Sequence, residues 1–203
     1  MLAELKKKDA NIEKIAKMAL KEEKLLSELV NNLKSKEETV RYNSYKVILL
    51  ISEEQPDVIY PRWDFLESMM DGSNAYWRSS SARLIGNLAR VDKENRFEKI
   101  LDRYYNLLND SVIVAYTITA CSGRIAKAKL KLQAKITEKL LNIDKTNQKH
   151  KDLIKAGAIE SFSEYFEEAK NKKKILKFVK EQLGCESPKT RKIAKEFLKR
   201  WEE

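Results

Sequence analysis

The sequence predicts an all-α fold made of repeated helical hairpins, and three observations lead to this fold class. First, the 203 residues include only 5 Gly and 3 Pro, too few for the many turns of a β-rich fold of this size. Second, residues that favour helices, chiefly Lys, Leu, Glu and Ala, are used heavily. Third, apolar residues recur at helical spacing, and that pattern itself repeats along the chain.

The repeat is clearest in three consecutive segments that share one phase. Arg41 and Arg78 lie 37 residues apart, and the same step separates Gly86 from Gly123. The register loosens after residue 127, where the link over residues 144–149 is longer, and it returns near the end of the chain. A hairpin of this size cannot bury its apolar stripe alone, so we expect the units to stack.

Each unit is predicted to hold two helices, with polar and Gly-containing turns between them. Residues 1–21 carry a further apolar stripe that includes Ile12, Ile15 and Leu20, and we expect them to form an N-terminal capping helix over the first unit. The predicted hairpins, which form one continuous domain over residues 22–203, span approximately residues 22–54, 55–92, 93–127, 128–170 and 171–203.

The beginning of the second helix in several units resembles that of HEAT repeats, which place an apolar–Arg step after a turn. Val40-Arg41 and Trp77-Arg78 are similar to that pattern, and so is the segment 187–191. The third unit departs from it, and the fourth, with Lys155-Ala156-Gly157-Ala158-Ile159, looks more like an armadillo repeat. The resemblance covers about residues 22–203 and implies a right-handed α-α superhelix, a solenoid of about five hairpins. Arg41 and Arg78 are then expected to join adjacent repeats through carboxylates or helix-end carbonyls.

The positive charge is concentrated in the last third of the chain. Residues 127–203 contain 21 Lys and Arg against 12 Asp and Glu, a net charge of +9 within a total of +10. Such an excess attracts nucleic acid or an acidic partner, or simply keeps the surface solvated. The longest apolar run, Val47–Ile51, is far short of a membrane span, and the first residues lack the apolar segment of a signal peptide. We therefore expect a cytoplasmic protein with no membrane partner.

No recognisable catalytic, metal or cofactor site is found in the sequence. The single histidine, His150, lies in a Lys-rich link, and no glycine loop suited to phosphate is present. Two cysteines are too few for a disulfide framework or a zinc site. Cys121 falls on an apolar stripe and is expected in the core, whereas Cys185 follows a glycine at a helix end and is expected to be partly exposed. We expect no enzymatic activity and no cofactor.

The resemblance places the second helix of each hairpin on the concave side. In the second unit the apolar stripe includes Trp77, Leu84 and Leu88, so the adjoining residues should form a ridge that faces the concave side. Shifting that ridge by one repeat gives its counterparts in the other units. The candidate partner-binding residues are Lys46, Tyr76, Arg83, Asn87, Arg90, Arg124, Lys127, Lys195 and Lys199.

Two functions compete for this ridge. The first is a scaffold or adaptor that binds a protein partner, such as an acidic helix or peptide, through a pre-formed concave surface. The second is a nucleic-acid-binding solenoid that uses the basic C-terminal third, although Glu160 and Glu164 would interrupt a track of cations. A more remote alternative is a relative of the HEAT-like DNA glycosylases, which would need an Asp beside a Trp on the ridge, whereas Trp63 and Trp77 fall at core positions.

Overall fold

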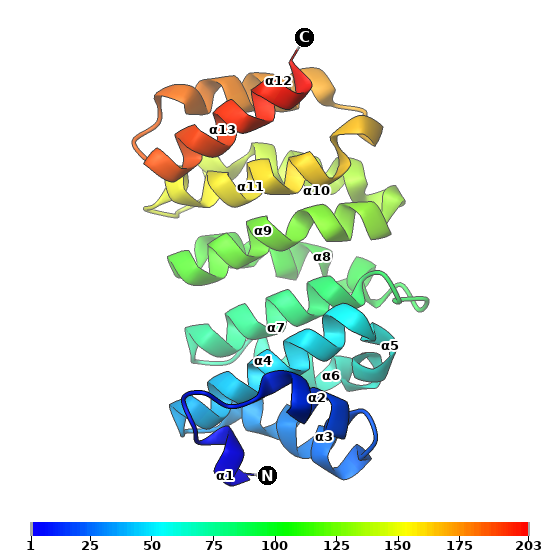
Figure 1. Ribbon diagram of the computed structural model, residues 1–203. Coiled ribbons are helices and arrows are strands. Elements are labelled where there is room, and N and C mark those ends of the chain that lie inside the picture. The colour runs from blue at the N-terminus through cyan, green and yellow to red at the C-terminus, as the bar shows by residue number, and fades with distance from the viewer. Residues whose placement is uncertain (1, 203) are drawn as a thin grey trace.

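The computed structural model describes residues 2–202, and every regular element in that range is helical. The hairpins follow one another along a single direction, from α3 and α4 near the N-terminus to α12 and α13 at the other end (Figure 1). Their helices are α3 (Glu23–Asn31) and α4 (Glu38–Glu54); α5 (Pro56–Ile59) and α6 (Trp63–Met69) with α7 (Ala75–Leu88); α8 (Arg96–Asn106) and α9 (Val112–Ala128); α10 (Gln133–Leu141) and α11 (Lys151–Tyr165); and α12 (Lys172–Glu181) and α13 (Pro188–Trp201).

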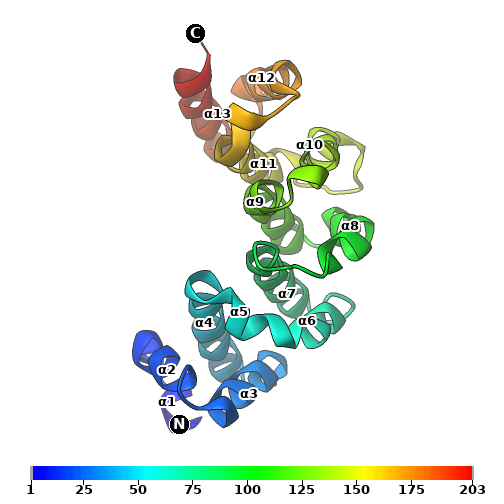
Figure 2. The same ribbon diagram turned by 90° about the vertical axis from the view of Figure 1, so that its right-hand side faces the viewer.

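The second helices of the hairpins, α4, α7, α9, α11 and α13, pack against one another in succession and form one layer, while the first helices form the other. Figure 2 shows that the whole stack is bowed, with the second helices along its inner side. We call the two sides the inner and the outer face. The core runs between the layers, and its largest buried side chains include Trp63, Tyr104 and Phe162.

The N-terminal segment differs from the single capping helix expected over residues 1–21. It forms two short helices, α1 (Leu2–Leu5) and α2 (Ile12–Ala19), and both pack against α4. The break has a local cause, because the side chain of Asn11 accepts a hydrogen bond from the Lys14 amide and so caps a new helix. The buried amide of Asn43 donates to the carbonyls of Leu5 (2.9 Å) and Lys7 (2.8 Å), which fixes this segment on the first hairpin.

The expected role of the repeated arginines is confirmed for Arg78 alone, because Arg41 bonds within its own hairpin. Arg41, Arg78 and Arg191 each donate a hydrogen bond to the backbone carbonyl six residues earlier, at distances of 2.9, 2.6 and 2.7 Å. Each arginine therefore closes the turn before its own helix. Arg78 also holds both carboxylate oxygens of Asp110, at 2.5 and 2.8 Å, and so joins the second hairpin to the third.

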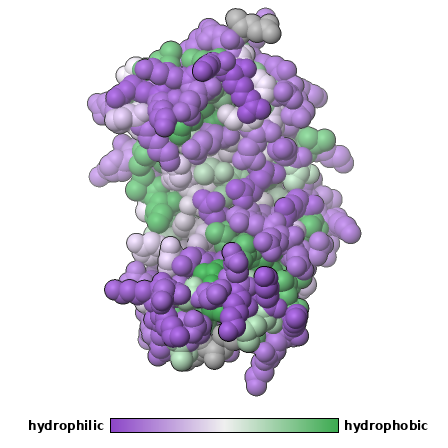
Figure 3. All heavy atoms as spheres, viewed as in Figure 1, coloured by the Kyte–Doolittle hydropathy of each residue, from purple (hydrophilic) through white to green (hydrophobic). Residues whose placement is uncertain are grey.

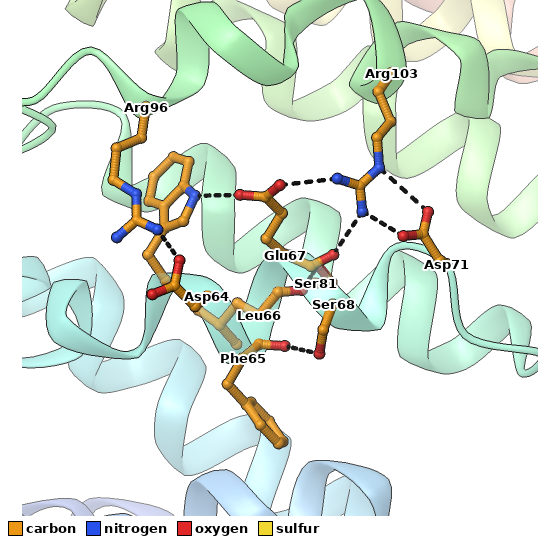
Figure 4. Close-up of polar contacts among 10 residues, drawn as sticks. Asp64, Phe65, Leu66, Glu67, Ser68, Asp71, Ser81, Arg96 and Arg103 are labelled. Carbon is orange, nitrogen blue, oxygen red and sulfur yellow. Dashed lines mark hydrogen bonds and ion pairs between the residues drawn. The ribbon is translucent and has the colours of Figure 1, made fainter.

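Ion pairs connect the hairpins along the outer face, and the first helices supply both partners. Arg103 donates to Glu67 (2.8 Å) and to Asp71 (2.5 Å), and Arg96 pairs with Asp64 beside the buried Trp63, as Figure 4 shows. The other members of this ladder are Arg62–Glu23, Lys135–Asp102, Lys139–Asp102 and Lys174–Glu138. On this face many of the cations therefore have a carboxylate in the preceding hairpin.

A fully buried ion pair joins the second hairpin, the third and the segment between them. The Asp92 carboxylate accepts bonds from the Tyr60 hydroxyl (2.8 Å), the amides of Arg96 (2.9 Å) and Phe97 (3.0 Å), and the Lys129 ammonium (2.8 Å). Burial alone would raise the pKa of Asp92, but these donors, Lys129 foremost, hold that pKa below its usual value. The side chain of Asp92 is 0% exposed, so these donors replace its hydration.

The second helices approach most closely between α9 and α11, where glycines face their neighbours. The amide of Gly123 donates to the Ser161 hydroxyl (2.8 Å), and that hydroxyl donates to the Thr119 carbonyl (2.5 Å). A Cβ placed on Gly123 would lie 2.7 Å from the Ser161 carbonyl, and one on Gly157 would lie 2.4 Å from the Thr119 hydroxyl. Glycine at both positions therefore sets the spacing of the inner layer.

Candidate interaction surface

Six of the predicted ridge residues lie on the inner face, and their side chains are at least partly exposed. They come from three successive helices and one adjoining turn: Lys46 from α4; Tyr76 and Arg83 from α7, with Arg90 two residues after its end; and Arg124 and Lys127 from α9. We call this set, together with the exposed Tyr42 and Ile113 described below, the inner ridge. Each side chain occupies a position that apolar phasing and the 37-residue step assign to it.

The prediction that Asn87 is available to a partner is wrong. Its side chain is only 4% exposed, and its amide donates to the Ser52 hydroxyl of the preceding hairpin at 2.8 Å. Its carbonyl oxygen accepts a bond from Arg124 of the following hairpin. Neighbouring hairpins close over the end of α7, so the polar side chain of Asn87 is bonded across the stack rather than presented to solvent.

Lys195 and Lys199 also lie elsewhere than predicted. When α13 is aligned with α7 through the shared arginine contact, Lys195 falls on Ala82 and Lys199 on Gly86. In α7 that side faces the next helix, because a Cβ on Gly86 would lie 3.1 Å from the Cβ of Cys121. No hairpin follows α13 in the described residues, so both lysines are exposed on the end of the stack and outside the inner ridge. Because the repeat register loosens before this hairpin, the predicted ridge positions on α13 were displaced by one residue.

The cations of the inner ridge fall into two groups. Arg90 donates to the carbonyls of Ser52 and Glu53 at the end of α4, and Arg124 bonds Asn87 and lies 3.8 Å from the Glu53 carboxylate. These two arginines therefore hold the stack together.

The second group is formed by Lys46, Arg83 and Lys127. Among the described residues, none of the three pairs with a carboxylate within 4 Å, in contrast to the ion-pair ladder of the outer face. Within residues 2–202 these three positive charges therefore have no ion-pair partner.

A shallow hollow of about 340 Å³ opens on the inner face beside these groups. The residues that line it come from four successive helices and are Glu53, Gly86, Asn87, Arg90, Arg124 and Glu164. Burial raises the pKa of the Glu164 carboxyl, although the charges of Arg124 and Lys127 oppose that shift. The two carboxylates that line the hollow, Glu53 and Glu164, balance its two guanidiniums, Arg90 and Arg124, so the hollow has no formal net charge.

Exposed apolar side chains lie near the beginning of the inner helices, whereas Arg124 and Lys127 lie near the end of α9. Tyr42 is 58% exposed, Tyr76 56% and Ile113 41%, and we call these three residues the apolar strip. Figure 3 shows that the inner face is mainly hydrophilic, with hydrophobic atoms gathered at its left edge near the beginning of α9. The repeat step placed Tyr76 and Ile113 here. Tyr42 was missed because it precedes the position aligned with Ser80 by one residue.

The cysteines occupy the environments expected of them. Cys121 is fully buried in α9, and burial raises the pKa of its thiol. Cys185 is half-buried in the turn before α13. His150 is exposed just before α11. Within residues 2–202, no three His, Cys, Asp or Glu side chains gather as a metal ion would need, and no helix is both long and apolar enough to span a bilayer.

No protein-family model matches the chain, and a search of curated proteins returns no similar sequence. The functional argument therefore rests on the geometry and charge of the inner ridge.

Proposed function

We propose that this chain is a non-enzymatic HEAT-repeat scaffold, a right-handed α-α superhelix that binds a protein partner through the inner ridge. The repeat step of 37 residues, the stacking of hairpins in order and the shared arginine contact before α4, α7 and α13 support that architecture. The chain is then an adaptor, whose rigid inner face holds side chains from several hairpins in fixed positions.

One observation carries the proposal of a binding face. Many cations of the outer face are paired with carboxylates of the preceding hairpin, including Arg96, Arg103 and Lys174, whereas Lys46, Arg83 and Lys127 of the inner ridge have no such partner among the described residues. The apolar strip lies on the same three helices, and two of its members are tyrosines. Tyrosine and arginine are enriched where proteins bind one another, and tyrosine presents a large contact area at low entropic cost.

A second candidate function, nucleic-acid binding, is favoured by the excess charge of the last third of the chain. A phosphate backbone needs cations at regular steps along one face. On α11, however, the exposed residues of the inner side are Glu160 and Glu164, and they separate the cations of α9 from those of α13. The glycosylase alternative has less support, because Trp63 is fully buried and its indole donates to Glu67.

Site-specific photo-crosslinking tests the proposal directly. A photoreactive phenylalanine analogue replaces Arg83 on the inner ridge, and a matched control carries it at the exposed Lys99 of α8 on the outer side. We expect a discrete cross-linked protein from native lysate at position 83 and none at position 99. Equal yields at both positions, or none at either, would contradict the proposal.

Titration with labelled duplex and single-stranded oligonucleotides at two salt concentrations separates the two candidate functions. Binding that weakens steeply with salt would favour the nucleic-acid function, because released counterions produce that dependence. We expect no binding that survives physiological salt.

A further inference from the structure

The apolar strip and the unpaired cations lie on the same three helices, the strip near the beginnings of the helices and Lys127 near the end of α9, and together they suggest what kind of partner fits. Tyr76 and Ile113 are each the second residue of their helix, in α7 and α9, and Tyr42 lies one turn into α4. Packed helices are about 8–10 Å apart, so the strip offers apolar contacts at roughly that spacing along the stack. Three of the seven exposed large hydrophobic side chains among the described residues belong to it.

The charges of the inner ridge that lack an ion-pair partner are all positive. Among the described residues, Lys46, Arg83 and Lys127 have no carboxylate partner, and Arg90 after α7 and Arg124 on α9 add two further positive charges. The acidic side chain from α4, α7 and α9 that lines the hollow here is Glu53. The next helix, α11, reverses the sign with Glu160 and Glu164 and so limits the positive region.

The tyrosines also discriminate between two polyanionic partners, an acidic peptide and a single-stranded nucleic acid. Nucleic acids bind such surfaces by stacking bases on aromatic rings. Here cations already lie over the rings, Lys46 at 4.8 Å from the centre of Tyr42 and Arg41 at 6.0 Å from that of Tyr76. The third member of the strip, Ile113, offers no ring. The strip is therefore better suited to apolar contact with amino-acid side chains than to stacking with bases.

We infer that the inner ridge of α4, α7 and α9 binds an acidic segment of a partner protein that carries at least one aromatic or large aliphatic side chain. The apolar side chain contacts the strip, and the partner's carboxylates lie against Lys46, Arg83 and Lys127. Glu160 and Glu164 repel a continuation of the acidic segment across α11. This inference rests on the proposed function and adds to it the chemistry of the partner.

A displayed library of random 12-residue peptides, selected against the full chain, tests the inference. We expect the enriched peptides to share a net negative charge and an aromatic or large aliphatic residue. Enrichment of basic or neutral peptides, or no enrichment, would overturn the inference. A 12-nucleotide single strand serves as the competing probe, and it would overturn the inference if it bound more tightly than the best peptide.

Two pairs of variants locate the site for the best synthetic peptide. Lys46→Glu with Lys127→Glu should weaken binding at least tenfold, whereas the control Lys99→Glu with Lys173→Glu, which changes the total charge equally, should not. Ile113→Ala should weaken binding about fivefold or more, whereas Leu183→Ala, which removes a side chain of similar exposure (39% against 41%), should have no effect. Circular dichroism checks that all variants are folded. Equal loss in a variant and its control would contradict the site.

The photo-crosslinking result keeps this inference separate from the proposed function. A partner that cross-links at position 83 but is not acidic there would leave the scaffold function standing and overturn the partner chemistry. No specific cross-link, together with no enriched peptide, would overturn both.

Discussion

Substitution of Gly123 by alanine probes the packing that sets the curvature of the inner layer. The new Cβ would lie 2.7 Å from both the carbonyl oxygen of Ser161 and the carboxyl carbon of Glu164. The Glu164 side chain can rotate away, but the Ser161 carbonyl belongs to the backbone of α11. Relief therefore requires α9 and α11 to separate, and the bond from the Gly123 amide to the Ser161 hydroxyl lengthens with them.

The expected magnitude follows from two opposing effects. Overpacking against an unyielding neighbour costs up to about 3 kcal/mol, and replacing glycine by alanine inside a helix returns about 1 kcal/mol. We therefore expect Gly123→Ala to lower the free energy of unfolding by about 2 kcal/mol, measured by urea denaturation followed by far-UV circular dichroism.

Gly184 provides the matched control, because nothing lies within 4 Å of a Cβ built there. Gly184→Ala should leave the stability unchanged or raise it by up to about 1 kcal/mol, through the reduced entropy of the unfolded chain. If Gly123→Ala proved as stable as the wild type, the close approach of α9 and α11 would not be real, and the reasoning would fail.

Three further predictions concern stability and thiol reactivity. Asp92→Asn should lower the free energy of unfolding by about 3–5 kcal/mol at neutral pH, because it leaves the buried Lys129 ammonium without its counter-charge. Folding lowers the pKa of Asp92, so the stability that this carboxylate contributes is complete above the unfolded carboxyl pKa of about 3.9. In acid denaturation curves the difference between wild type and variant should shrink as the pH falls through the folded-state pKa. Arg78→Ala should cost about 2 kcal/mol more than Arg41→Ala in chemical denaturation, because Arg78 alone of the two also binds a carboxylate of the next hairpin; equal costs would argue against that link. A chromogenic disulfide reagent should label Cys185 in the native protein and Cys121 only after unfolding; fast labelling of both would contradict the burial of Cys121.

The helical class and the hairpin boundaries could be predicted because they depend on local signals. Apolar spacing and turn residues placed the helices between residues 22 and 126, and the step of 37 residues placed Arg41 and Arg78 in equivalent contacts. The same step carried Tyr76 to Ile113 on the inner ridge. Such inferences hold wherever the repeat keeps its phase.

The remaining features depend on contacts between hairpins, and such contacts cannot be predicted from the spacing of residues in one sequence. Asn87 has the phase of a surface residue, but the neighbouring hairpins bury it. Lys195 and Lys199 lie beyond the loosened register, where a shift of one residue turns a side chain by about 100° around the helix. The ion-pair ladder joins residues in different hairpins, and the number of residues between the partners varies from one pair to the next. A periodic pattern in the sequence therefore does not predict it.

Lysine acetylation footprinting of the chain with its bound partner tests the central claim most directly. Lys46 and Lys127 lie on the inner ridge, while Lys99 and Lys173 are exposed on the outer helices α8 and α12 and serve as internal references. We predict that the partner slows acetylation of the two inner lysines severalfold and leaves the two outer ones unchanged. Protection of the outer lysines with the inner ones unaffected would contradict the claim that the inner ridge is the binding face.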